Sequence, residues 1–187
     1  MPALTTNRLR LFPITLPMIE GVMCRDRAAA EAALDACMRE HGYDLPACAR
    51  FPDAWPNEEL VARAFPLSLD EIRADPDTRL WGDSIVLPRE GPPRVVGSVV
   101  FKGRPRDGIA EVAYGIEDSS RGQGLATEAT LACIDWALAQ EGITAVHATT
   151  FPWHFASLGV IRKVGMVQVD TREHDIFGEL LVFERKR

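Results

Sequence analysis

The chain has 187 residues and a formal net charge of −6, with 47% hydrophobic and 26% charged residues. This length fits one domain, and the composition is that of an ordinary globular protein, which excludes a disordered or membrane-embedded chain. The acidic balance argues against a general nucleic-acid or anionic-membrane binder, since both reward a basic surface. We therefore expect neutral or cationic partners, with no nucleic acid and no membrane among them.

The four cysteines, Cys24, Cys37, Cys48 and Cys133, have no CxxC spacing and are too sparse for a disulfide scaffold or a zinc knuckle. Free thiols in a reducing compartment are the expected state. The first residues, MPALTTNRLRLFPI, contain no long apolar segment, and nothing downstream reaches the ~18 apolar residues of a spanning helix. These features predict a cytoplasmic protein.

The chain begins with a strand pattern followed by helix patterns. Leu9 and Leu11 alternate with arginines in RLRLFPI, which predicts a half-buried first strand. Thr15 can cap a helix that starts at Leu16. Residues 25–42 are rich in alanine and end in glycine, which predicts a strong helix.

The next segment, about residues 46–66, is punctuated by prolines, and we interpret it as an insertion. Two short helices are predicted at 57–65 and 68–75, opened by asparagine and serine. Residues 83–88, 94–103 and 108–117 are rich in β-forming residues. Because RPRDG between the last two is typical of a hairpin turn, three antiparallel strands are predicted.

The pattern then changes to a long helix over residues 124–140 that is apolar on almost every side and is therefore expected to be buried. A strand at 143–150, a short helix at 155–165 and a closing hairpin of 166–174 with 179–186 complete the chain. Together these elements predict an α/β fold, an α+β sandwich around one mixed sheet.

The stretch SSRGQGLATEA, residues 119–129, joins the last of the three strands to the long helix. The first amides of a helix lack intrahelical partners and carry the positive end of its dipole, so an anion binds there favourably. Gly122 and Gly124 allow close approach of the backbone, and Ala126 leaves room in the first turn. The stretch lacks the ending of a nucleotide-binding P-loop. A tight connection without a ligand is the alternative interpretation.

Arg121-Gly122-Gln123-Gly124-Leu125-Ala126 resembles the Arg/Gln-x-x-Gly-x-Gly/Ala signature of the GNAT superfamily of N-acetyltransferases. EVAYGIEDSSRGQGLATEATLACIDWAL, FASLGVIRKVGM and TTNRLRLFPIT look like its RimJ/RimL-type branch. The similarity covers about residues 94–187 and 4–16. It implies a single N-acetyltransferase domain over 1–187. Its sheet would be mixed and largely antiparallel, with helices on both faces and a splayed central strand pair. A variable helical insertion at about 20–80 would build the acceptor pocket.

The resemblance also implies the reaction. An acetyl group would pass from acetyl-CoA, a cosubstrate, to a primary amine by direct attack in a ternary complex, with no metal. The acceptor would be a protein N-terminal α-amine or a small-molecule amine, and the protein a monomer or homodimer. A non-catalytic acyl-CoA sensor or regulatory module of the same fold is the alternative. The implied acetyl-CoA contacts are Tyr114, Gly115, Ile116, Arg121, Gly122, Gln123, Gly124, Leu125, Ala126, Thr127, His154 and Ser157.

Two positions depart from the family pattern. His154 stands where the family usually has asparagine; it can donate to a pantetheine carbonyl, or it can cap the helix or face water. Ile161 stands where many relatives carry the tyrosine that protonates the departing thiolate. Ser157, four residues earlier on the same helix face, is the nearest substitute. Plain N-terminal capping by Ser157 and proton donation by water stay open.

An ammonium must lose a proton before its lone pair can attack a thioester, so the reaction calls for a base. Glu111 resembles, in position, the strand glutamate that serves as base in histone-type members of the superfamily. It shares a strand face with Ala113 and Gly115, which leave space beside it. An exposed edge glutamate is the alternative. Glu117 and Asp118 are expected to be ordinary solvated acids.

Other reactive residue types receive structural interpretations. Cys133 lies among apolar residues in the long helix, which favours a packed thiol over a nucleophile. His147 and His174 lie in strand patterns with no partner at metal-ligand spacing, so core or surface roles are expected.

The hairpin FKGRPRDG carries Lys102, Arg104 and Arg106, which either contact a substrate carboxylate or form a solvated tip. Trp55 and Trp81 flank the variable region, where they form either pocket walls or simple core. The sequence leaves both pairs of alternatives open.

Overall fold

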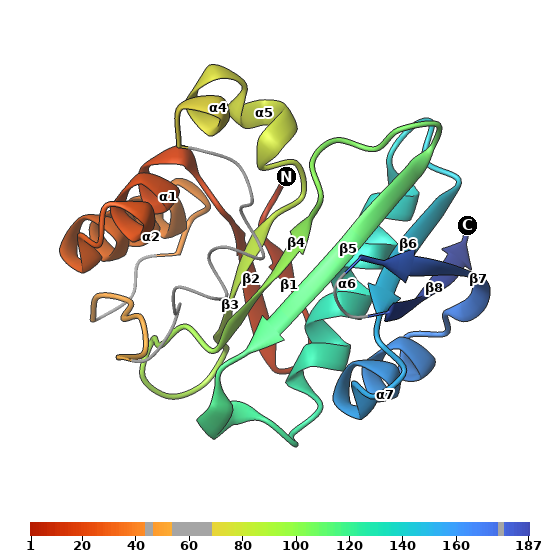
Figure 1. Ribbon diagram of the computed structural model, residues 1–187. Coiled ribbons are helices and arrows are strands. Elements are labelled where there is room, and N and C mark those ends of the chain that lie inside the picture. Colours follow the sequence, from red (N-terminus) through yellow and green to blue (C-terminus); the bar gives the residue numbers. More distant parts are fainter. Residues whose placement is uncertain (44–46, 54–68, 176–177) are drawn as a thin grey trace.

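In the computed structural model, residues 1–43, 47–53, 69–175 and 178–187 are described. Eight strands in these ranges form one sheet in the order β1-β2-β3-β4-β5-β6-β8-β7 (Figure 1). Neighbouring strands are antiparallel except for β5 and β6, which are parallel. The strands are β1 Leu4–Thr5, β2 Leu9–Pro13, β3 Ser84–Pro88, β4 Gly97–Phe101, β5 Ile109–Ile116, β6 Ala145–Thr150, β7 Val167–His174 and β8 Gly178–Lys186.

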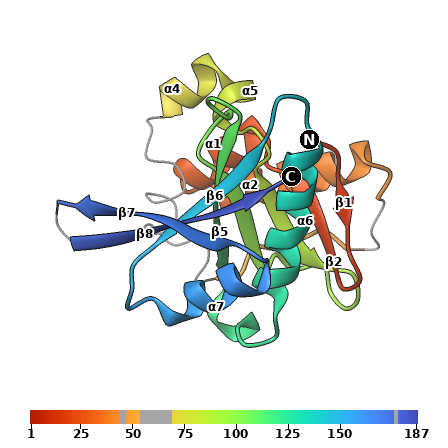
Figure 2. The ribbon, with the colours of Figure 1, turned by 90° about the vertical axis from the view of Figure 1, so that its right-hand side faces the viewer.

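Helices cover both faces of the sheet, as Figures 1 and 2 show. Helices α1 and α2 pack on one face, over β2 and its neighbours, and α6 and α7 pack on the other. The described helices are α1 Leu16–Met23, α2 Arg27–Glu40, α4 Leu69–Ala74, α5 Pro76–Arg79, α6 Leu125–Ala139 and α7 Phe155–Lys163, with a 3₁₀ turn at Asp118–Ser120. The predicted fold class is confirmed.

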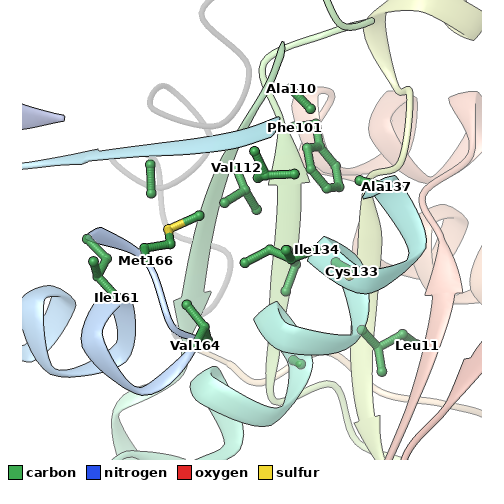
Figure 3. Packing of buried hydrophobic residues seen from close by; sticks show 14 of the residues in the cluster. Leu11, Phe101, Ala110, Val112, Cys133, Ile134, Ala137, Ile161, Val164 and Met166 are labelled. Atoms are coloured by element: carbon green, nitrogen blue, oxygen red, sulfur yellow. The ribbon is translucent and has the colours of Figure 1, made fainter. Parts of the chain in front are cut away.

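The period of two along each strand divides the core between the two faces. In β2, Leu9 and Leu11 pack toward α6, whereas Phe12 packs toward α1 and α2. Figure 3 shows Val112 of β5 and Ile134 of α6 in the α6-side cluster. The alternation predicted for β2 is therefore correct. The prediction of a half-buried first strand is wrong, because β1 precedes β2 and both faces of β2 are covered.

Most predicted elements are present, and the exceptions have local causes. The helix predicted from residue 25 begins at Arg27, because Arg25 takes a positive φ of 60° and the Asp26 side chain caps the amide of Ala29. Thr15 does occupy the N-cap of α1, but its side chain makes no cap hydrogen bond. The helix predicted at 57–65 lies outside the described residues, and β1 and α5 are too short to give a periodic signal.

The sheet splays between β5 and β6. These strands pair only over Ile109–Glu111 and Ala145–His147, after which β6 continues beside β8 and β5 continues beside β4. Glu111 is thus the last residue of β5 that pairs with β6. Beyond it, as far as Ile116, one edge of β5 pairs with no strand among the described residues, and the predicted splayed central pair is present.

Candidate acetyl-CoA site

The turn before α6 is built for close approach to its backbone. Gly122 and Gly124 have φ values of 76° and 77°, the left-handed region that disfavours residues with a Cβ. A Cβ at Gly122 would meet nothing within 4 Å, and one at Gly124 would meet only Nη2 of Arg8, at 3.6 Å. Conformation rather than crowding therefore requires glycine here, and the part of the chain that the structure describes leaves the space beside both residues open.

The amides that begin α6 are left free of side-chain caps. Gly124 is the N-cap and offers no side chain, whereas Asp26 and Asp75 cap the first turns of α2 and α5. The N–H groups of Leu125, Ala126 and Thr127 therefore retain their capacity to bind an anion. The Leu125 side chain is buried in the core, so that residue offers only its backbone to a ligand.

The free edge of β5 leads from Glu111 to this turn. The N–H of Lys102 donates to the carbonyl of Glu111 and the N–H of Glu117 donates to that of Val96, which fixes odd-numbered residues of β5 as those bonded to β4. The backbone groups of Val112, Tyr114 and Ile116 therefore point toward the gap beside β6, and those of Gly115 point toward β4. An extended ligand laid along this edge meets strand-like donors and acceptors.

Glu111 stands at the vertex of the splay and is already engaged on one oxygen. Its Oε1 accepts hydrogen bonds from Lys102 Nζ and, at 3.0 Å, from Thr149 Oγ1. Its Oε2 accepts none from the residues that the structure describes. Its side chain is 26% exposed, so Glu111 is partly enclosed rather than a freely solvated edge residue.

Ser157 and Tyr114 meet across the site. Ser157 is the third residue of α7, whose N-cap is His154, so it is not a plain capping serine. The Tyr114 hydroxyl lies 3.0 Å from Ser157 Oγ and donates to the Ser157 carbonyl at 3.1 Å. Burial raises the pKa of Tyr114 above its ordinary value, more than the hydrogen bond with Ser157 lowers it, so the phenol keeps its proton at neutral pH.

The two departures from the family pattern have different surroundings. His154 is exposed, and its side chain makes no cap hydrogen bond to α7. Ile161 is fully buried among the residues beneath α7, close to Val164 and Met166 in Figure 3. Ile161 therefore serves packing, while the His154 side chain is available to a ligand.

The expectation that Glu117 is a solvated acid is wrong. Only 8% of this residue is exposed, and its carboxylate accepts hydrogen bonds from Ser119 and Ser120 and lies 3.5 Å from Arg94. Those serine bonds lower the pKa of Glu117 below its ordinary value and order the chain as it enters the glycine turn. Asp118 is solvated as expected, although it pairs with Arg121 at 2.8 Å.

The other reactive or aromatic residues considered in the sequence make packing or pairing contacts where the structure describes them. Cys133 is buried and its pKa is raised to about 12 by burial, as a packed thiol requires. His147 Nε2 lies 3.2 Å from Glu184 Oε2. In the described ranges no cluster of three or more His, Cys, Asp or Glu residues is arranged to hold a metal ion. Trp81 packs against Phe101 in the core, and Trp55 lies outside the described residues.

Sequence reasoning missed two features. The first is the pairing of Lys102 with Glu111, which the hairpin register, with Phe101 opposite Val112, would have revealed.

The second is a cluster beside the glycine turn, which joins residues over 100 positions apart. There Glu128 of α6 binds Thr6 and Arg8, and Arg8 Nη1 donates to the carbonyl of Gln123 at 2.9 Å.

The predicted contact residues therefore come from three segments: the end of β5, the turn that opens α6, and the beginning of α7. Figure 1 shows the arrowhead of β5 and the first turn of α6 at the same end of the sheet, and the Tyr114–Ser157 contact joins α7 to them. None of the helices in the described ranges combines the length and hydrophobicity of a membrane-spanning segment.

Comparison with known proteins identifies the family. Residues 27–167 match the acetyltransferase (GNAT) domain. The chain is 26% identical over 168 residues to a Bacillus subtilis (strain 168) protein named uncharacterized N-acetyltransferase YjdG, which covers 89% of this chain and 90% of that protein. The fold of the present chain resembles that of the ribosomal-protein-S5-alanine acetyltransferase of Vibrio fischeri. The TM-score is 0.62 at 14% identity, and the match covers 100% of this chain and 97% of that one.

A second similar fold is that of RimL, a ribosomal L7/L12 alpha-N-protein acetyltransferase solved in complex with coenzyme A. The TM-score is 0.59 at 14% identity, with coverage of 97% of this chain and 95% of that one. At such identities the two structures show a shared fold. Because the domain match spans well over half of its residues, the chain belongs to the GNAT family and is an acetyl-CoA-dependent N-acetyltransferase.

Proposed function

We propose that the chain transfers the acetyl group of acetyl-CoA to a primary amine by direct attack in a ternary complex. The observation that carries this proposal is the edge of β5 that faces the gap, which has the uncapped glycine turn before α6 at one end and Glu111 at the other. Five residues of strand span roughly 17 Å, a length that an extended pantetheine arm can follow. One strand would thus fix the distance between the proposed cofactor anchor and the proposed base.

The residues at the turn suit acetyl-CoA, which supplies an activated acetyl group as a thioester. The uncapped amides of Leu125, Ala126 and Thr127, with those of the glycine turn, would hold the diphosphate. The backbone of Val112, Tyr114 and Ile116 would hold the pantetheine arm, and His154 would donate to one of its carbonyls. An N–H on the free edge of β5 would polarise the thioester carbonyl.

Glu111 would take the proton from the attacking amine, directly or through one water. A lysine with a pKa near 10.4 is neutral about once in 2,500 molecules at pH 7, whereas an α-amine with a pKa near 7.7–8.0 is neutral in roughly a tenth or more. Lysine therefore depends more on a base. Lys102 and Thr149 hold Oε1 of Glu111, which would leave Oε2 to accept the proton.

Ser157 would return a proton to the departing thiolate, since Ile161 has no proton to give. The Tyr114 hydroxyl contacts Ser157 Oγ and fixes the start of α7 through the Ser157 carbonyl. Tyr114 would thereby orient Ser157. Proximity and orientation of the two substrates would supply much of the rate acceleration.

The acceptor would be either the α-amine of a protein or peptide or a small-molecule amine. We propose that the chain is one N-acetyltransferase domain in which residues of about 20–80, between β2 and β3, build the acceptor pocket. The described part of this segment contributes α1, α2, α4 and α5.

An amine panel tests the proposal. The protein is incubated with acetyl-CoA together with one amine at a time: a peptide with a free α-amine, a peptide with a lysine side chain, or a small primary amine. Thiol release and acetylated product are measured in each case. The proposal predicts amine-dependent thiol release, with initial-rate lines that intersect as a ternary complex requires. Tight CoA binding with no transfer to any amine would instead support a regulatory module, and parallel lines would contradict direct attack.

A further inference from the structure

Arg8 lies beside the turn that opens α6, although it precedes that turn by more than 100 residues. Its Nε donates to Glu128 Oε2 at 2.7 Å and its backbone N–H donates to Oε1 at 2.8 Å. Thr6 Oγ1 donates to the same Oε1 at 2.6 Å. The cluster made by Thr6, Arg8 and Glu128 therefore ties the segment before β2 to the first turn of α6.

The position of Glu128 creates an electrostatic conflict for an anion-binding helix. A carboxylate in the first turn interacts favourably with the helix dipole, so it competes with a diphosphate for the same positive end and repels it. Burial acts to raise the pKa of Glu128, but the hydrogen bonds from Thr6 and Arg8 outweigh it and leave the pKa below its ordinary value. Glu128 is therefore negatively charged at neutral pH, and only a nearby cation removes the conflict.

Arg8 is placed to act on the turn as well as on Glu128. Its Nη1 donates to the carbonyl of Gln123 at 2.9 Å and so fixes that peptide group within the turn. Its Nη2 lies 3.6 Å from the position of a Cβ at Gly124, on the open side of the turn. The guanidinium carries five N–H groups, of which these contacts use two, and the side chain is 47% exposed.

We propose that Arg8 is a binding and positioning residue for the diphosphate of acetyl-CoA. It neutralises Glu128, fixes the carbonyl of Gln123 and presents its remaining N–H groups beside Gly124 to a phosphate oxygen. This inference rests on the proposed acetyl-CoA site and adds to it a residue from outside the glycine turn. A purely structural tie between β2 and α6 would need no phosphate, and that difference can be measured.

The test compares two ligands by calorimetric titration: CoA, and pantetheine, which has the thiol arm and no phosphate. Arg8→Ala should lower CoA affinity roughly ten- to a hundredfold, the range for a charge-assisted hydrogen bond, and change pantetheine affinity less than about twofold. Adding Glu128→Gln to Arg8→Ala should recover part of the CoA affinity, because the uncompensated carboxylate is gone. Arg10→Ala is the matched control: Arg10 lies over the Tyr43 ring, so CoA affinity should stay at the parent value.

Three results would overturn the inference: Arg8→Ala binding CoA as tightly as the parent, an equal loss for CoA and pantetheine, or a double variant no tighter than Arg8→Ala alone. Melting temperatures of all variants identify any that fail to fold. If Arg8→Ala does not fold, Arg8→Lys, which keeps the charge but not the forked geometry, replaces it and should show an intermediate loss of CoA affinity. A parent protein that does not bind CoA would instead remove the proposed function and this inference with it.

Discussion

The carboxyl group of Asp83, 1% exposed just before β3, accepts a hydrogen bond from the backbone N–H of Phe101 at 2.7 Å. Burial raises its pKa well above the ordinary value near 3.8, more than that hydrogen bond lowers it. The folded state therefore keeps a proton that the unfolded chain has lost. Stability contributed by this group is complete below about pH 4 and falls as the pH rises toward the folded pKa.

Asp83→Asn removes this pH dependence while keeping an acceptor for the Phe101 amide. We expect the free energy of unfolding of the variant to exceed that of the parent at pH 7, with the difference shrinking toward pH 4. Urea denaturation at several pH values measures both. If the difference in unfolding free energy between Asp83→Asn and the parent were the same at pH 5 and pH 7, the raised pKa of Asp83 would be contradicted.

Glu111→Gln tests the base. The variant should keep CoA affinity, lower turnover by roughly 10²–10⁴ at neutral pH, and recover part of the loss as the pH rises and more of the amine is already neutral. Glu184→Gln is the control, because Glu184 pairs with His147 on a neighbouring strand and has no place in the proposed reaction. A pH–rate profile of Glu111→Gln that matches the parent would make Glu111 a structural or binding residue.

Ser157→Ala tests the acid. If the Ser157 hydroxyl protonates the thiolate, kcat should fall by roughly 10²–10⁴. Tyr114→Phe removes only the hydroxyl that contacts Ser157, so a smaller loss, on the order of tenfold, is expected from one missing hydrogen bond. A loss below about threefold in Ser157→Ala would assign proton donation to water.

At the scale of elements, the proposed cofactor binding depends on the first turn of α6. Gly124→Ala forces a Cβ into the left-handed region, at a cost of roughly 1–2 kcal/mol, and projects it into the space proposed for the diphosphate. We expect CoA affinity to fall at least tenfold while the protein remains folded.

The N-terminus of α2 supplies the matched control for that experiment. Asp26→Ala removes the side-chain cap on Ala29, at a cost of roughly 1 kcal/mol, a destabilisation similar to that of Gly124→Ala. Asp26→Ala should bind CoA normally. Equal CoA affinities in the two variants would show that the glycine turn has no part in binding.

Elements with strong local signals could be predicted from the sequence, and contacts between distant elements could not. The alanine-rich α2, the apolar α6 and the hairpin of β4 and β5 follow from periodicity and turn residues. The two-residue β1 is too short for any period. The burial of Glu117 was predicted wrongly, because it depends on how the chain packs and on Arg94, which comes from the loop between β3 and β4, as well as on the neighbouring Ser119 and Ser120.

The candidate site divides in the same way. Its glycine turn is a contiguous motif that can be read directly from the sequence, whereas the Tyr114–Ser157 and Arg8–Glu128 contacts join segments more than 40 positions apart. Such pairs arise from sheet order and helix packing, which a single sequence does not encode locally.

At the scale of the whole molecule, one sheet links the two halves of the proposed site. Strand β5 pairs with β4 over Val112–Ile116 and with β6 only over Ile109–Glu111, so the cofactor would fill a gap that the fold leaves in its own centre. A ligand held there contacts β5, α6 and α7 together. Binding should therefore stabilise the folded state as a whole.

The unfolding free energy of the parent protein, measured with and without CoA, tests most directly whether the gap beside β5 holds acetyl-CoA. Because CoA would bind only the folded state, CoA at ~100 times its Kd should add about 2.7 kcal/mol, accompanied by calorimetric binding at one site per chain. An unfolding free energy unchanged at millimolar CoA, with no heat of binding, would contradict the claim that the gap beside β5 and the turn before α6 hold acetyl-CoA.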